Sequence, residues 1–128
     1  MRRISSWKFG DTRKEADELV GLVILGKKRA TSSLYEGYKT SKLPKVGERS
    51  IIKDSRGRNR CLIINTKVKI LAFGNVGKTF AFKEGEGDRS SRYWRNVHRK
   101  FFKKAAGKKF NEDSLVVCQE FKVLKVFD

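Results

Sequence analysis

The segment Cys61-Leu62-Ile63-Ile64, followed after one residue by Thr66-Lys67-Val68-Lys69-Ile70-Leu71, decides the fold class. The first four residues are all apolar, as in a strand buried on both faces. The next six alternate between polar and apolar, as in a strand with one face in water. Shorter strand patterns lie at residues 50–53, 115–118 and 121–127, the last two forming one long terminal strand or a bulged pair. Together these runs predict a small, mainly antiparallel sheet.

Two amphipathic helices accompany the strands. Apolar residues at helical spacing predict the first over residues 12–25 and the second over residues 91–104. We expect one face of the second helix to enter the core through Trp94, Val97 and Phe101. The result is an α+β fold with about two helices flanking a closed or half-closed barrel, because closing the sheet hides its strand edges.

The length of the chain indicates how many domains it forms, and its charge indicates which kind of partner it binds. The chain has 128 residues, which suits a single domain over residues 1–128. Its formal net charge is +17, from 31 Lys+Arg against 14 Asp+Glu, so an anionic partner is a reasonable inference and RNA is the first candidate. The charge is uneven, since residues 89–109 include many Lys and Arg and no acid. Basic residues that are merely solvated are the alternative.

The sequence contains no apolar stretch long enough to span a bilayer and no signal-peptide pattern. We therefore expect a cytoplasmic protein without a membrane partner. In that setting Cys61 and Cys118 are expected to be two buried thiols and not a disulfide.

Two short segments carry most of the chemistry. Gly26-Lys27-Lys28-Arg29-Ala30-Thr31 follows the first helix, and Glu84-Gly85-Glu86-Gly87-Asp88 precedes the second. A lysine and a threonine three residues apart, with a distant acidic loop, form one polar pocket if the segments meet in space. Residues three positions apart face opposite sides of an extended segment. Lys28 and Thr31 can therefore face the same pocket only if a turn or bulge lies between them.

Each of these residues also has a purely structural interpretation. Lys28 could be a solvated cation at a helix C-terminus, where the helix dipole favours positive charge. Thr31 could be a β-branched residue that starts a strand. The loop acids suit a helix N-terminus, and the sequence does not select among Glu84, Glu86 and Asp88 as the acid that faces inward. Alternating carboxylates suit a divalent cation, but the loop lacks the EF-hand pattern, so we expect no metal and no cofactor.

The order of several segments resembles the ASCH domain, a relative of the PUA RNA-binding fold. The resemblance covers nearly the whole chain. It is carried by Trp7-Lys8-Phe9-Gly10-Asp11, Gly26-Lys27-Lys28-Arg29-Ala30-Thr31, Leu43-Pro44-Lys45-Val46-Gly47, Phe80-Ala81-Phe82-Lys83-Glu84-Gly85-Glu86-Gly87-Asp88 and Leu115-Val116-Val117-Cys118. It implies a small PUA-like β-barrel with flanking helices and a cleft for RNA or a nucleotide. Residues 84–94 are similar to the loop of the larger, bacterial-type subgroup.

The resemblance also implies site residues. Some small members of the family hydrolyse the amide of acetylated cytidine with a lysine, a threonine three residues later and a distant glutamate. Carried over to this chain, these residues are Lys28, Thr31 and Glu84. Other members are described as ribonucleases. Arg29 departs from the family pattern, which often has threonine there, and it adds charge beside Lys28.

Basic and aromatic side chains indicate where nucleic acid would bind. Lysine and arginine bind phosphate, and tyrosine stacks on unpaired bases at ~1–3 kcal/mol per base. We expect the nucleic-acid-binding residues to be Lys27, Arg29, Lys53, Arg89, Arg92, Tyr93, Arg95, Arg99 and Lys103.

Three functions follow as hypotheses. The leading one is an RNA- or nucleotide-binding domain in RNA metabolism, with a pocket for a base or nucleoside of single-stranded RNA. The second is an enzyme that uses the same pocket, either a ribonuclease or an amidohydrolase that deacylates acetylated cytidine. The only histidine, His98, lies mid-helix among basic residues, a poor place for a base, and a two-histidine ribonuclease mechanism is excluded. The third is a protein-interaction module with an acidic partner. The sequence leaves the oligomeric state open.

Overall fold

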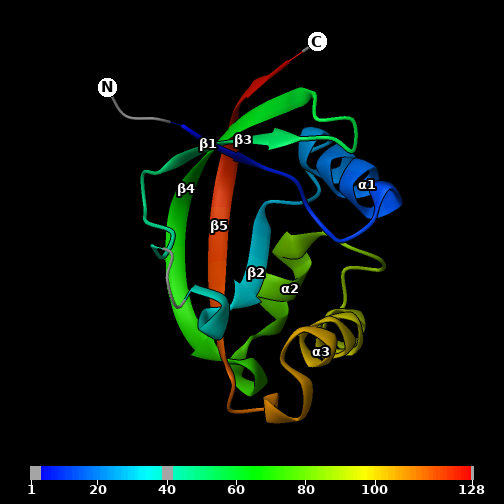
Figure 1. The fold of residues 1–128 in the computed structure, drawn as a ribbon, viewed down its shortest axis with the longest axis vertical. Coiled ribbons are helices and arrows are strands. Elements are labelled where there is room, and N and C mark those ends of the chain that lie inside the picture. Colours follow the sequence, from blue (N-terminus) through cyan, green and yellow to red (C-terminus); the bar gives the residue numbers. More distant parts are fainter. Residues whose placement is uncertain (1–3, 39–41, 128) are drawn as a thin grey trace.

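The framework of the protein is one curled sheet of five strands, which surrounds the core like half a barrel (Figure 1). The computed structural model describes residues 4–38 and 42–127. The strands lie in the order β1-β3-β4-β5-β2, and all neighbours are antiparallel except the parallel pair β1 and β3. Their bounds are β1 Ser5–Trp7, β2 Ala30–Leu34, β3 Arg49–Lys53, β4 Asn59–Ala72 and β5 Leu115–Val126. The predicted α+β fold with a mainly antiparallel, half-closed barrel is confirmed.

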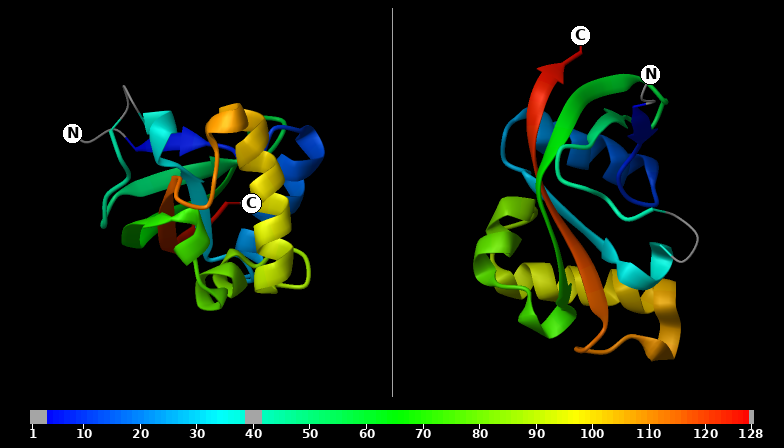
Figure 2. Two further views of the ribbon diagram at one scale, coloured as in Figure 1. Left: turned by 90° about the horizontal axis from the view of Figure 1, so that it is seen from below. Right: turned by 90° about the vertical axis from the view of Figure 1, so that its left-hand side faces the viewer.

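The two runs that predicted the sheet form a single strand, β4, which has 14 residues and pairs along most of its length with the 12-residue β5. The register of this pair shifts between Leu62 and Ile63 and again between Asn65 and Lys67. Such bulges bend and twist a strand pair, and Figure 2 shows β4 and β5 curving together across the molecule. Asn65 therefore marks a bend in the strand and not its end.

Three α-helices cover the sheet: α1 Arg13–Ile24, α2 Lys78–Glu84 and α3 Ser91–Ala106. The first and third are the two predicted helices. The second was not predicted from the sequence, in which Phe80-Ala81-Phe82 only leads into the acidic loop. Packing decides its conformation, since Ala81 is buried and Phe80 packs partly against the core. In the described parts of the chain, no helix has the length and apolar character needed to cross a membrane.

The core has one apolar cluster at each end of the sheet. The cluster under α1 consists of Phe9, Val20, Val23, Ile52, Cys61, Ile63 and Phe121. The cluster under α2 and α3 consists of Phe73, Val76, Ala81, Trp94, Phe102, Phe110, Val116 and Cys118. Both cysteines are buried free thiols, as predicted. Burial raises their pKa to about 11 for Cys61 and about 12 for Cys118, so the thiols are inert at neutral pH.

The predicted core face of α3 is only partly correct. Trp94 is buried, but Val97 is 36% exposed and Phe101 is 40% exposed. The buried stripe instead continues from Trp94 to His98 and Phe102, which follow at intervals of four residues. Val97 and Phe101 lie to one side of this stripe and are left to line a hollow at the surface.

Phe73 lies at the centre of the cluster under α2 and α3, and we expect its replacement to destabilise the fold strongly. Its buried ring stacks on Trp94, with centroids 5.4 Å apart, and meets the edges of Phe102 and Phe110. Phe73→Ala should lower the free energy of unfolding by ~3–5 kcal/mol. The control Leu25→Ala removes a side chain that is 71% exposed and should cost less than about 0.5 kcal/mol. Urea unfolding measures both, and similar losses in the two variants would contradict this view of the core.

Candidate functional site

A buried lysine lies between two carboxylates where the turn after α1 meets the loop after α2. Lys28 Nζ is 2.9 Å from Glu84 Oε1 and 2.8 Å from Glu86 Oε2. The side chains of Lys28 and Glu84 are each 1% exposed, while that of Glu86 is 18% exposed. Two segments that are distant in sequence thus form one charged cluster.

Tight backbone turns bring these groups together. The amides of Lys27 and Lys28 both donate to the carbonyl of Leu22, which folds the chain back at the end of α1. On the other side, Gly85 ends α2 with a left-handed φ of 73°, and a Cβ there would overlap the carbonyl of Lys27. The glycine in this acidic loop therefore permits close approach to the protein's own chain, which fixes Glu84 against Lys28.

The Glu84 carboxylate is the hub of the site. Its Oε2 accepts hydrogen bonds from Ser32 Oγ at 2.6 Å and from Trp94 Nε1 at 2.7 Å, and it lies 3.4 Å from His98 Nε2. The other His98 nitrogen, Nδ1, is 2.9 Å from the Trp94 carbonyl oxygen. Side chains from β2 and α3, together with Lys28 from the turn after α1, thus converge on a single carboxylate of α2.

Sequence reasoning missed three members of this network: Ser32, Trp94 and His98. Trp94 was assigned to the core for its ring alone, and His98 was set aside because its neighbours in sequence are basic. The sequence did contain an indication of this network. A buried indole N–H needs a hydrogen-bond acceptor, and His98 follows Trp94 by one helical turn, so both polar groups face the same side of the helix. The sequence could not show that the acceptor is Glu84.

Charge in the cluster is stabilised by mutual contact. Burial alone would lower the pKa of the Lys28 amine, but the Glu84 and Glu86 carboxylates outweigh it and hold that pKa above its usual value. Burial would raise the pKa of Glu84, but Lys28 and the hydrogen-bond donors around it hold that pKa below its usual range. At neutral pH the site therefore contains the Lys28 ammonium paired with the ionised Glu84 carboxylate.

Beside the cluster is a small hollow of about 100 Å³, here called the Lys28 pocket. Its polar lining includes Lys28, Thr31, Ser32, Glu84, Glu86 and His98. Its apolar lining includes Phe9, Leu19, Val97 and Phe101. The structure therefore places the three residues carried over from the resemblance around one hollow.

The geometry between Lys28 and Thr31 follows from where the strand begins. Lys28 lies in the turn before β2, so the rule that residues three apart face opposite sides of a strand does not apply to this pair. Thr31 lies in β2, an edge strand that pairs only with β5 among the described strands. Within the described residues its hydroxyl has no hydrogen-bond partner, so it is available to a ligand.

The acids of the loop differ in orientation. Glu84 and Glu86 face Lys28, whereas Asp88 is exposed and its Oδ1 accepts a hydrogen bond from the amide of Ser90, the N-cap of α3. One potential ligand atom from each of Glu84, Glu86 and His98 lies within 4.8 Å of the others, a spacing that suits a metal ion. The Lys28 ammonium already contacts both carboxylates and supplies positive charge there.

Three of the predicted nucleic-acid-binding residues make contacts within the protein. The Arg95 guanidinium donates to the carbonyls of Phe73, Gly74 and Val76, and Arg99 pairs with Glu112 at 2.9 Å. Arg89 is also held by the fold, with its guanidinium 3.8 Å from the centre of the Phe82 ring. The side chains of Lys27, Arg29, Arg92, Tyr93 and Lys103 are exposed, and that of Lys53 is half-buried.

Helix geometry puts two other lysines on the side of α3 that carries Val97, a residue of the Lys28 pocket. Val97 and Arg99 are about 160° apart around the helix axis, so Arg99 faces away from the pocket. Lys100 and Lys104 follow Val97 by three and seven residues, which puts them on its side of α3, and both are exposed. These two lysines are better placed than Arg95 and Arg99 to meet a phosphate beside the pocket.

His98 reports directly on the charge of Glu84, because it is the only histidine. Burial would lower its pKa, but the ionised Glu84 outweighs this effect and holds the pKa above the usual 6.5. Protonated His98 thus stabilises the fold fully below about pH 6.5, and this contribution is lost as the pH rises through the higher folded-state pKa. An NMR titration of the imidazole should show a midpoint above 6.5.

Glu84→Gln should move that midpoint downward, since burial remains and the nearby charge is gone. Glu112→Gln is the matched control, because Glu112 contacts Arg99 and not His98. A midpoint that is the same in both variants and in the unaltered protein would show that Glu84 does not control the imidazole.

Comparisons with known proteins agree with this architecture. Residues 5–125 match the family model of the ASCH domain. An ASCH domain from Lactobacillus crispatus JV V101 is 34% identical, with a TM-score of 0.89, over 94% of this chain and 79% of that one. A protein from Enterococcus faecalis V583 is also 34% identical, with a TM-score of 0.87, over 99% of this chain and 84% of that one.

A more distant likeness concerns the fold alone. An ASCH protein from Zymomonas mobilis is 10% identical, with a TM-score of 0.57, over 98% of this chain and 71% of that one. A search of curated proteins found no match. Because the family model covers almost the entire chain, this protein belongs to the ASCH domain family.

Proposed function

We propose that this protein binds RNA and that the Lys28 pocket receives one unpaired base. The observation that carries the proposal is the pocket itself, in which apolar walls surround a buried cluster of fixed charges and a free hydroxyl. The ASCH family has a PUA-like fold that is often linked to RNA binding. A net charge of +17 supports the same class of partner.

The lining of the pocket suits a flat heterocycle. Phe9, Leu19 and Phe101 offer apolar surface for the face of a ring, while Thr31 and Glu86 offer a hydroxyl and a carboxylate to its polar edge. The volume of about 100 Å³ is too small for a whole nucleotide. At most one base would enter such a space, so the sugar and phosphate would lie outside, on the side of α3 that carries Lys100 and Lys104.

The electrostatics favour binding over catalysis. A lysine nucleophile must be partly neutral, but the two carboxylates hold the pKa of Lys28 above its usual value. A general base must exchange protons near neutral pH, but the pKa of Glu84 is held below its usual range and both of its oxygens accept hydrogen bonds. These groups are therefore suited to fix the shape and polarity of a recognition pocket.

Thr31→Val tests the role of the pocket in recognition. The substitution keeps the side-chain shape and removes the hydroxyl, so affinity for the preferred nucleoside monophosphate should fall about 2- to 10-fold. Isothermal titration calorimetry with each of the four ribonucleoside monophosphates measures this loss. Thr79→Val is the control, since Thr79 is exposed on α2 and does not line the pocket. Equal affinities in both variants would remove Thr31 from the binding site.

The alternative function is catalysis by the same pocket, favoured by one observation: Lys28, Thr31 and Glu84 line one hollow. It would be a ribonuclease or an amidohydrolase that deacylates acetylated cytidine. In that case Lys28 would polarise the carbonyl or phosphoryl oxygen as a cation, and the partly exposed Glu86 carboxylate would orient water.

We expect binding without turnover when acetylated cytidine or labelled single-stranded RNA is incubated with the protein. The decisive variant is Lys28→Met/Glu84→Gln, because removing Lys28 alone would leave a buried carboxylate unpaired at a cost of ~3–5 kcal/mol. Turnover by the unaltered protein that disappears in the folded double variant would establish the enzyme instead.

A further inference from the structure

We propose that the ligand is a single strand of at least three nucleotides, whose bases lie along an aromatic path that starts at the Lys28 pocket and ends beside Lys42 and Lys45. This inference rests on the proposed function and names its partner more narrowly. It follows from the continuity of three hollows and from the side chains that they share.

The second hollow lies between β2 and the C-terminal half of α3. It has a volume of about 410 Å³ and is lined by Leu34, Tyr38, Phe101 and Ala105, among others. Phe101 also lines the Lys28 pocket, so its half-exposed ring separates two adjacent spaces. A chain that places one base in the Lys28 pocket can place the next over Phe101.

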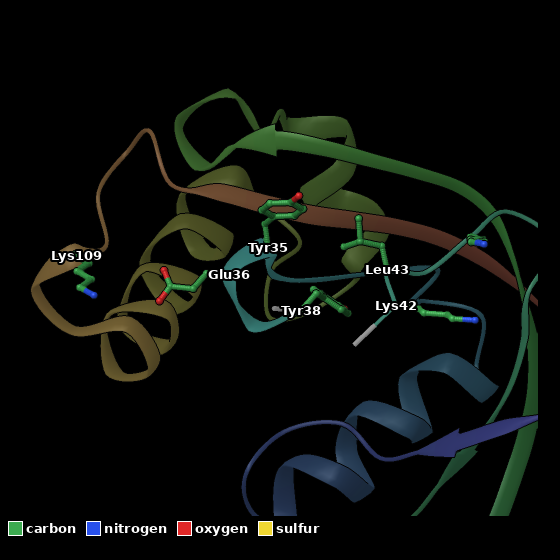
Figure 3. A pocket seen from close by; sticks show the side chains of 7 residues that line it. Tyr35, Glu36, Tyr38, Lys42, Leu43 and Lys109 are labelled. Carbon is green, nitrogen blue, oxygen red and sulfur yellow. The ribbon is translucent and has the colours of Figure 1, made fainter. Parts of the chain in front are cut away.

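The third hollow continues from the second through Glu36 and Tyr38, which line both. It has a volume of about 850 Å³. Figure 3 shows Tyr35, Tyr38 and Leu43 gathered at its centre, with Lys42 at one end and Lys109 at the other. Ser33 Oγ is 2.7 Å from the Tyr38 hydroxyl oxygen, a hydrogen bond that fixes the position of the ring.

The composition of this path identifies the occupant. Sites for single-stranded nucleic acid combine aromatic rings, on which successive bases stack, with cations that follow the phosphates. Here Phe101, Tyr38 and Tyr35 supply the rings, and Tyr35 is 41% exposed. The cations are Lys42, Lys45 and Lys109, all exposed, with Glu36 as the single acid in the third hollow.

The positive charge along the path favours single-stranded RNA over an apolar peptide as the ligand. An apolar peptide would fit the second hollow, where Phe101, Phe102 and Ala105 lie, but in the third hollow it would meet Lys42, Lys45 and Lys109 without offering them a negative charge. A duplex is also unsuitable, because its bases are stacked on one another and cannot lie on protein rings. A single strand satisfies both the rings and the lysines.

The test uses fluorescence anisotropy with three RNA probes: a labelled single strand of about ten nucleotides, the same strand annealed to its complement, and a labelled nucleoside monophosphate. We expect the single strand to bind at least tenfold more tightly than either of the others. Tyr35→Ala should weaken its binding about 5- to 100-fold. The same variant should leave monophosphate binding unchanged, and Tyr35→Phe should bind both as the unaltered protein does.

A matched pair of charge variants tests the lysines. Lys42→Ala/Lys45→Ala and Lys69→Ala/Lys122→Ala each remove two positive charges, but Lys69 and Lys122 line none of the three hollows. The first double variant should weaken single-strand binding and reduce its salt dependence more than the second.

The outcomes are distinguishable. If Thr31→Val weakens binding while Tyr35→Ala and Lys42→Ala/Lys45→Ala behave as their controls do, the path is wrong and the base pocket stands. Equal affinity for single strand and duplex also overturns the path. If no RNA probe binds, the path and the proposed function fall together.

Discussion

The ion pair between Lys28 and Glu84 is the constraint on which the rest of the structure depends. Each charge is almost fully shielded from water, so removing one partner would leave the other buried with fewer compensating contacts. Because Lys28 follows α1 and Glu84 ends α2, the pair fixes the relative position of two helices. The donors from Ser32, Trp94 and His98 extend the same requirement to β2 and α3.

A buried charged cluster is not the only way to stabilise such an interior. Apolar residues of similar volume often replace a buried ion pair at no loss, whereas removal of one partner is costly. The cluster does supply a rigid set of polar groups beside an apolar hollow, where the loss of hydration has already been compensated within the protein. A ligand that enters this hollow meets groups that need no reorganisation, and this is the usual advantage of a preorganised site.

Much of the fold could be predicted from local patterns, and the site only in outline. Periodicity located both long strands and two helices, because each buries a regular stripe. It failed for α2, whose seven residues are stabilised by packing and not by a clear pattern. Lys28 and Glu84 were predicted through family resemblance, but their contact was not, since it depends on two turns. Arg95 and Arg99 were assigned to ligand binding from charge alone, and the sequence did not show that they also contact backbone carbonyls and Glu112 within the protein.

The position of β2 at the edge of the sheet has a consequence for the evolution of the pocket. A bare edge strand offers unpaired amides and carbonyls to any passing chain and so promotes self-association. Helix α2 lies against β2 and carries Glu84, which lines the Lys28 pocket. A change that widened the hollow by displacing α2 would therefore also uncover the edge strand. Resistance to self-association thus bears on how wide this pocket can become, independently of what it binds.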